Sequence, residues 1–197
     1  MTTIGITGGI GMGKSTAEQF LLKRGIPVID TDRLARELVE PGQPALSEIV
    51  QAFGKDILKP DGSLDRGGLA TRVFADAARR EQLENILHPP IRTAWEQQIA
   101  AWKSQGHLLA AVVIPLLFET NAERDVEVTV CLACTAATQQ HRLQARGWSN
   151  EQIHQRIEAQ MPVESKMARA RYVIWTEGSL EVHAEQWKRI VRRLSAG

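Results

Sequence analysis

At 197 residues with 43% hydrophobic content, the chain is long enough for one well-cored domain and short for two independent ones. Its 24 Lys and Arg residues balance 23 Asp and Glu residues, so the net charge of +1 excludes a general electrostatic attraction to nucleic acid or to an anionic membrane. No segment has the roughly 18 consecutive apolar residues of a membrane span, and the N-terminus lacks the features of a secretory signal. We expect a cytoplasmic protein that needs no nucleic-acid, membrane or obligate protein partner.

Short apolar runs rich in β-branched residues predict the strands of a sheet. Runs that are apolar almost throughout suit strands covered on both faces, and the helical stretches between them provide the crossovers that parallel strands require. The predicted fold class is therefore α/β, with a doubly wound five-stranded parallel sheet. The runs are residues 2–8, 26–30, 107–115, 126–132 and 171–176.

Two segments do not fit simple crossovers. The long interval between the second and third runs contains turn signals at EPGQP and KPDGS and several amphipathic pieces, which predicts a helical subdomain. Residues 142–162 are polar, rich in Arg and Gln and broken at Gly147, which predicts a mobile helical hairpin. We therefore expect a single domain of residues 1–197, with a core of 1–32, 106–140 and 166–197, a helical subdomain at about 33–105 and a lid at about 141–165.

The sequence GGIGMGKST at residues 8–16 satisfies the pattern G-x-x-x-x-G-K-[ST] between an expected strand and an expected helix. Glycines let backbone N–H groups wrap a phosphate, and the helix N-terminus favours its negative charge. Lys14 would bridge the β and γ phosphates, Ser15 would ligate Mg²⁺ and Thr16 would donate to the α phosphate. The alternative is a tight glycine turn with an exposed lysine. The candidate nucleotide-binding residues are Gly8, Gly9, Gly11, Met12, Gly13, Lys14, Ser15 and Thr16.

An acidic pair, Asp30 and Asp32, ends the second apolar run. Ligand sites of α/β proteins lie at the carboxyl edge of the sheet, where two carboxylates can accept a hydroxyl proton or hold a metal through water. Alternatively, one of them caps the helix that begins near TDRLARELV, because Asp and Thr favour that position. Chemistry is the preferred interpretation for Asp32, whereas both remain open for Asp30.

Arg142 and Arg146 are four residues apart, so they share one face of a helix in the expected lid. Arginines that fold over a nucleotide neutralise the charge of a transferring phosphoryl group. Arg156 in the next helix is a candidate for the same task, and a solvated helix face is the alternative for all of them.

The two cysteines, Cys131 and Cys134, form a C-x-x-C pattern within VTVCLACTAA. This spacing occurs in redox motifs and in halves of zinc sites, but a zinc site needs two further ligands, and none is evident nearby. Two small residues that close a buried strand are the favoured interpretation.

With these features assembled, the chain resembles the bacterial dephospho-coenzyme A kinases over nearly its whole length. The piece GITGGIGMGKST could occur in any P-loop protein, whereas GIPVIDTDRLARELVEPG, the LHP sequence and PLLFE are more specific to this family. The matching pieces are GITGGIGMGKST, GIPVIDTDRLARELVEPG, GSLDRGGLATRVF, LENILHPPIR, VIPLLFE and RIEAQMP.

The resemblance implies ATP-dependent phosphorylation of the ribose 3'-hydroxyl of dephospho-coenzyme A, the last step of coenzyme A synthesis. It implies that the helical subdomain binds the acceptor and that residues 11–16 bind ATP with Mg²⁺. Asp32 would be the base, and Arg142 and Arg146 would be the lid arginines. The implied acceptor-side residues are His88, Pro115, Leu116 and Glu119, together with Asp32.

The acceptor-side residues also have structural interpretations. His88 precedes a proline, where a histidine often ends a helix. Pro115 and Leu116 would belong to the core, and Glu119 would cap a helix or face the site. Near the C-terminus the chain departs from the family pattern, because Arg171, Trp175 and Thr176 stand where Asp, Asp and Asn are usual, close to where such folds hold the adenine.

Two other functions remain open on sequence alone. A nucleoside or nucleotide kinase would share the phosphate loop and the lid. A nucleotide-dependent switch would share the loop, but the chain has no N-K-x-D motif that reads guanine, and Pro115 follows the third run where many P-loop motors have Asp.

Overall fold

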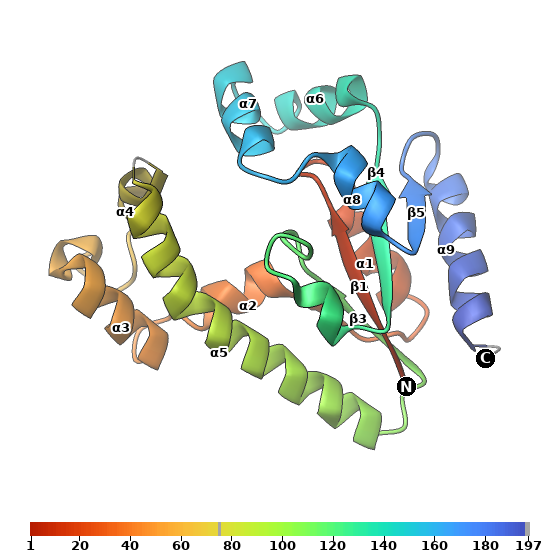
Figure 1. The fold of residues 1–197 in the computed structure, drawn as a ribbon, viewed down its shortest axis with the longest axis horizontal. Helices are drawn as coiled ribbons and strands as arrows, with labels where there is room; N and C mark the ends of the chain where they lie inside the picture. Colours follow the sequence, from red (N-terminus) through yellow and green to blue (C-terminus); the bar gives the residue numbers. More distant parts are fainter. Residues whose placement is uncertain (75, 196–197) are drawn as a thin grey trace. The chain divides into compact units, whose positions relative to one another are not determined.

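The computed structural model describes residues 1–74 and 76–195. These form two compact units, one of residues 1–30 and 99–197 and the other of residues 31–98, and helix α5 (Ala77–Ser104) belongs to both. The first unit contains a five-stranded sheet in which all strands are parallel (Figure 1). The strands are β1 (Thr2–Gly8), β2 (Val28–Asp30), β3 (Leu109–Val113), β4 (Val128–Ala133) and β5 (Tyr172–Trp175).

The strands run in the order β2-β3-β1-β4-β5. Strand β1 is central, and its last residue, Gly8, is paired with Leu132 of β4. Strand β3 lies between β1 and β2, with Val113 paired to Ile6 on one side and to Asp30 on the other. The parallel sheet expected from the apolar runs is confirmed, and its carboxyl edge carries the start of the glycine loop.

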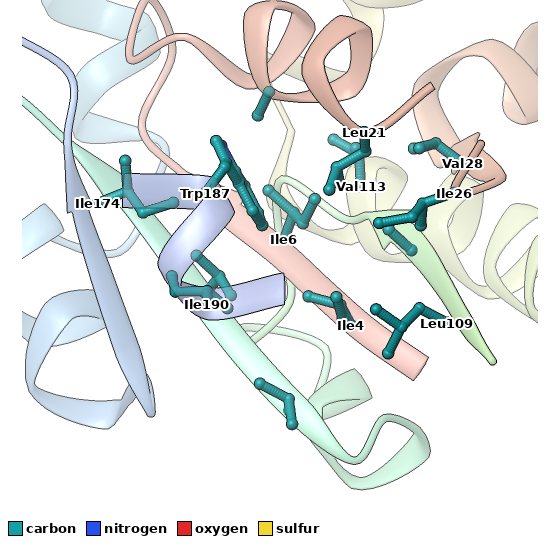
Figure 2. Packing of buried hydrophobic residues seen from close by; sticks show 14 of the residues in the cluster. Ile4, Ile6, Leu21, Ile26, Val28, Leu109, Val113, Ile174, Trp187 and Ile190 are labelled. Carbon is teal, nitrogen blue, oxygen red and sulfur yellow. The ribbon is translucent and has the colours of Figure 1, made fainter. Parts of the chain in front are cut away.

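Helices cover both faces of the sheet. On one face, α1 (Lys14–Leu22) and α9 (Leu180–Ser195) pack over the strands, and Figure 2 shows Leu21 and Trp187 directed at the strand residues around Ile6. On the other face, α8 (Val163–Arg169) contacts β1 and β4. Burying residues such as Leu21 and Trp187, both 0% exposed, contributes roughly 1.5–3 kcal/mol per large side chain. The sheet is therefore covered by helices on both faces, with an apolar cluster between the strands and helices α1 and α9.

The edge strand β5 has its own cover. The side-chain amide of Gln186 in α9 donates to the carbonyl of Trp175 at 2.8 Å, and the N–H of Trp175 donates back to Oε1 of Gln186 at 3.0 Å. An edge strand otherwise presents unpaired N–H and C=O groups, and here one side chain satisfies both groups of a residue.

The predicted helical hairpin is present as α6 (Ala136–Gln144) and α7 (Asn150–Glu158), which turn at Gly147 with φ +82°. Ser149 forms a capping box with Gln152 at the start of α7. Each helix buries one large apolar side chain, Leu143 in α6 and Ile153 in α7, whereas Ile157 of α7 is exposed.

The unit of residues 31–98 has a separate core. Leu46, Ile49 and Phe53 from α3 pack with residues of the following segments, and Leu83 and Leu87 of α5 pack against the same cluster. The helical elements before α5 are α2 (Thr31–Glu37), α3 (Pro44–Phe53), the 3-10 helix Lys55–Ile57 and α4 (Arg66–Phe74). Helix α5 continues through Pro89 and Pro90, so the expectation that His88 ends a helix is wrong. An internal proline costs roughly 3 kcal/mol, and the helix nevertheless continues between Leu87, which packs against the core of this unit, and the buried Trp95.

Candidate active site

The backbone conformation of the phosphate loop, residues 8–16, depends on its glycines. Gly8, Gly11 and Gly13 have φ values of +141°, +77° and +91°, a region that side chains with Cβ rarely adopt. A Cβ at Gly8 would lie 2.4 Å from the carbonyl oxygen of Leu132, and one at Gly11 would lie 3.0 Å from Leu143 in α6. Both positions therefore require glycine for φ and for space.

Lys14 begins helix α1 and reaches back over the loop. Its ammonium group donates to the carbonyl oxygens of Gly8 at 2.8 Å and Gly9 at 3.1 Å. The ammonium group is thus held above the loop, and the loop leads into the N-terminus of α1. In this arrangement backbone N–H groups and a lysine can bind phosphate together. Ser15 is exposed in the first turn of α1 and Thr16 is half-buried, so both hydroxyls lie at that N-terminus.

Arg142 lies against the loop, whereas Arg146 does not. The guanidinium of Arg142 donates to the carbonyl of Thr176 at 2.5 Å, to its hydroxyl at 3.0 Å, and to the carbonyl of Gly11 at 3.5 Å. Helix α6 ends at Gln144, so Arg146 lies beyond it and the two arginines do not share one helix face as expected. Arg146 is exposed, as is Arg156, whose guanidinium lies 4.8 Å from the ring centre of Trp148. Of the predicted lid arginines, only Arg142 contacts the loop in this conformation, and its partner Thr176 is one of the positions where the chain departs from the family pattern.

The segment after β3 is held by a buried lysine. Lys166 of α8 has a side chain that is 0% exposed, and its ammonium lies 2.7 Å from Oε1 of Glu119 and 2.7 Å from the carbonyl oxygen of Pro115. The same Pro115 oxygen accepts a hydrogen bond from the Thr7 hydroxyl at 3.0 Å, and Oε1 of Glu119 accepts from the N–H of Met161 at 3.0 Å. Glu119 thus links β3 to the chain that leaves α7.

Residues 115–119, which include the predicted acceptor-side residues Pro115, Leu116 and Glu119, differ in burial. Leu117 and Phe118 are buried core residues, and Pro115 and Leu116 are half-buried. The side chain of Glu119 is 21% exposed, and its Oε2 atom is buried without a hydrogen-bond partner. Glu119 is therefore neither an ordinary core residue nor a helix cap, and its role toward an acceptor stays a prediction.

The remaining predicted acceptor residues belong to the unit of residues 31–98 or lie at its edge. Asp30 is the last residue of β2, and Asp32 is an exposed residue in the first turn of α2. Because β3 separates β2 from β1, Asp30 ends the strand that lies two positions away from the loop-bearing strand. His88 is an exposed residue within α5. The roles of these residues stay predictions.

The two cysteines are free and buried. Cys131 lies in β4 and Cys134 directly follows that strand. Burial raises the pKa of the Cys131 thiol to about 11 and also raises the pKa of Cys134, so both thiols stay protonated at neutral pH. These properties fit small residues that close a strand and not a redox pair.

A cavity of about 620 Å³ lies beside the loop, and its lining includes Gly9, Met12, Met161 and Trp175. The cavity thus adjoins the first part of the loop, at Gly9 and Met12, whereas Lys14, Ser15 and Thr16 do not line it. Within the described part of the chain, no helix is long and apolar enough to cross a membrane.

A family model for dephospho-CoA kinase matches residues 2–181. The chain belongs to this family. A dephospho-CoA kinase of Anaeromyxobacter dehalogenans is 43% identical over 198 residues, which cover 100% of this chain and 94% of that protein. A crystal structure from Thermus thermophilus superimposes with a TM-score of 0.86 at 36% identity, covering 98% of this chain and 97% of the other. Family membership confirms the resemblance drawn from the motifs and the kinase class.

A more distant likeness extends to other kinases of small molecules. A shikimate kinase from Bacteroides thetaiotaomicron covers 97% of this chain and 98% of its own, with a TM-score of 0.51 and 20% identity. At that identity the likeness shows the fold alone, which is the P-loop kinase fold expected from the sequence.

Sequence inspection missed three polar residues that the structure places beside the site. Lys166 binds Glu119, Gln139 donates to the carbonyl of Ile10, and Gln160 accepts from the N–H of Ile10. The sequence RIEAQMP, which carried part of the resemblance, contains Gln160, and that was the available signal.

Proposed function

We propose that the chain transfers the γ-phosphoryl group of ATP to the ribose 3'-hydroxyl of dephospho-CoA, giving coenzyme A and ADP. The observation that carries the proposal is the loop of residues 8–16, with Lys14 held over it, in a chain of the dephospho-CoA kinase family. The family assignment favours this acceptor over nucleosides, and a kinase over a nucleotide-dependent switch.

The phosphate loop would hold the donor. Backbone N–H groups of residues 11–16 would bind the β and γ phosphates, and the Lys14 ammonium would leave the carbonyls of Gly8 and Gly9 to bridge those phosphates. The exposed Ser15 hydroxyl at the start of α1 fits a ligand of Mg²⁺. When bound, Mg²⁺ would neutralise charge that develops between the β and γ phosphates.

Arg142 and Arg146 would stabilise the transferring group. Arg142 lies at the loop already, bonded to the carbonyls of Gly11 and Thr176. Arg146 lies two residues after the end of α6 and would reach the phosphates after the α6–α7 hairpin moves as a lid. Guanidinium groups placed this way offset negative charge on the equatorial oxygens of the phosphoryl group.

Asp32 would orient the acceptor hydroxyl and take its proton. The oxygen–phosphorus bond to the acceptor forms as the bond from the γ-phosphorus to the bridging oxygen of ADP breaks, and the hydroxyl proton passes to the Asp32 carboxylate. In a loose transition state the proton leaves late, so orientation contributes as much as basicity. His88, Pro115, Leu116 and Glu119 would contact the acceptor, and the helical subdomain would bind most of it.

The deciding experiment measures ADP release with dephospho-CoA and with a panel of nucleosides. The proposal expects release that depends on dephospho-CoA, with coenzyme A formed in equal amount. Release stimulated only by a nucleoside would replace the proposed acceptor. Tight nucleotide binding with no transfer to any acceptor would favour the switch.

A variant set tests the base. Asp32→Asn is expected to lower kcat by about 10²–10⁴-fold, the usual contribution of a general base, while ATP binding measured by calorimetry stays unchanged. Asp30→Asn decides whether the neighbouring acid shares the role. Glu37→Gln, also an exposed acid of α2, is the matched control and should keep wild-type turnover. Full turnover in Asp32→Asn would show that the base is another group.

A further inference from the structure

The tip of the phosphate loop is fixed by two glutamine side chains. Nε2 of Gln139 donates to the carbonyl oxygen of Ile10 at 2.7 Å, and Oε1 of Gln160 accepts from the N–H of Ile10 at 3.1 Å. These residues are 129 and 150 positions away from Ile10 in sequence. Both polar backbone groups of one loop residue, the N–H and the C=O of Ile10, are therefore bonded to side chains of the segment that contains the α6–α7 hairpin.

The two glutamines lie at the two ends of the hairpin. Gln139 is in the first turns of α6, where its side chain is 5% exposed, and Gln160 follows the end of α7. A Cβ on Gly9 would come within 3.1 Å of Nε2 of Gln139, so the absence of a side chain at Gly9 lets this amide pack against the loop. The contact is built into both segments.

The chain after Gln160 is fixed as well. The N–H of Met161 donates to Glu119 at 3.0 Å, and Glu119 is held by the buried Lys166. Gln160 therefore projects toward Ile10 from a backbone that is anchored to the segment following β3. A shift at the exit of the hairpin changes the position of the Gln160 carboxamide relative to the loop.

The loop needs such support because its own backbone provides little. Three of its glycines have positive φ, and glycine loses more conformational freedom on ordering than any other residue. The N–H groups that would bind phosphate begin at Gly11, directly after Ile10. Fixing both polar backbone groups of Ile10 reduces the number of orientations available to these N–H groups before the nucleotide arrives.

We propose that Gln139 and Gln160 are positioning residues for phosphoryl transfer, which hold the C=O and N–H groups of Ile10 from the two ends of the α6–α7 hairpin and so align the phosphate-binding amides that follow Ile10. This proposal rests on the proposed kinase function. It adds a physical link through which lid position and nucleotide binding affect one another, because each state of the lid sets the two carboxamides and thereby the loop.

The test uses Gln139→Met, Gln160→Met and the double variant in the full chain. Methionine has a similar length but no amide, so the hydrogen bonds to Ile10 are lost with little change in packing. Gln144→Met is the matched control, because Gln144 is also a glutamine of α6 but donates to Asn150, inside the hairpin, at 2.9 Å. Calorimetry measures the Kd of ATP without any acceptor, and steady-state kinetics measure kcat and the amounts of ADP and coenzyme A formed.

Each test variant should raise the Kd of ATP by about tenfold and lower kcat, because a broken hydrogen bond leaves a loop N–H or C=O group without its partner. ADP formation should also exceed coenzyme A formation, because a misaligned phosphoryl group is transferred to water. The double variant should lose less than the product of the single effects, since both side chains act on the same loop residue, Ile10. The Gln144→Met control should stay within about twofold, and thermal melting should place all variants within a few degrees of the wild type.

An unchanged Kd and kcat in Gln160→Met would overturn the proposal, as would losses that follow the melting temperature alone. If the buried Gln139→Met variant does not fold, Gln160→Met decides by itself. The calorimetric result does not depend on the acceptor, so a wild-type chain that fails to use dephospho-CoA would refute the proposed function and leave the glutamine proposal open to its own measurement of ATP binding.

Discussion

Breaking the ion pair between Lys166 and Glu119 gives the clearest energetic test of the core around the site. The lysine side chain is 0% exposed and the glutamate side chain 21%, with 2.7 Å between Nζ and Oε1. In Lys166→Met the carboxylate would keep only the N–H of Met161 as a partner, and its Oε2 atom already lacks one. Removing one member of a buried pair costs about 3–5 kcal/mol, and the partial exposure of Glu119 favours the lower value of about 3 kcal/mol.

At about 2–4 °C per kcal/mol for a chain of this size, the melting temperature of Lys166→Met should fall by about 6–12 °C. Urea unfolding followed by circular dichroism measures the free-energy loss directly. The control is Lys188→Met, which removes an exposed lysine that lies 3.1 Å from Glu185. An exposed pair contributes about 0–1 kcal/mol, so the control should change stability little.

A double variant, Lys166→Met with Glu119→Gln, separates lost attraction from an uncompensated charge. Glutamine keeps an acceptor for the N–H of Met161 but carries no charge, so the double variant should recover at least about 1 kcal/mol relative to Lys166→Met. The reasoning fails if Lys166→Met loses less than about 1 kcal/mol, or if the two single losses simply add.

The remaining predictions concern the loop and the segment beside it. Gly8→Ala places a Cβ 2.4 Å from the carbonyl oxygen of Leu132, so it should destabilise the chain by more than Gly25→Ala, where φ is +71° but nothing lies within 4 Å. Denaturation curves of both variants measure the two losses of stability, and equal losses would contradict the steric argument. Hydrogen bonds from Thr135 and Thr138 lower the pKa of Glu177 from 4.5 to about 2. The stability that Glu177 contributes is therefore present above pH 4.5 and is lost as the pH falls from 4.5 through about 2. Glu177→Gln should reduce this acid sensitivity in unfolding curves, and an unchanged pH profile would be the contrary result.

The sheet and the phosphate loop were predictable because their signals are local. Each strand is a short apolar run, and the loop is a contiguous motif whose glycines meet steric limits set by Leu132 and Leu143. Helix α5 shows where local signals fail. Pro89 suggested a helix end at His88, but the helix continues through both prolines to Ser104, and its first half packs against the core of residues 31–98.

The polar contacts around the loop could not be predicted from spacing. Gln139, Gln160 and Lys166 meet partners far away in sequence, and the pattern of their own segment indicates only a polar surface. The fold decides which of these side chains turn inward. The roles of Asp32, Arg146 and His88 depend on bound substrates and stay predictions.

The contact between the Gln186 side chain of α9 and strand β5 affects whether copies of this chain associate at high concentration. Because its amide imitates the backbone of the next strand at Trp175, a second molecule would have to displace it before adding a strand there. The Gln186 side chain therefore hinders the growth of filaments by strand addition at this edge of the sheet.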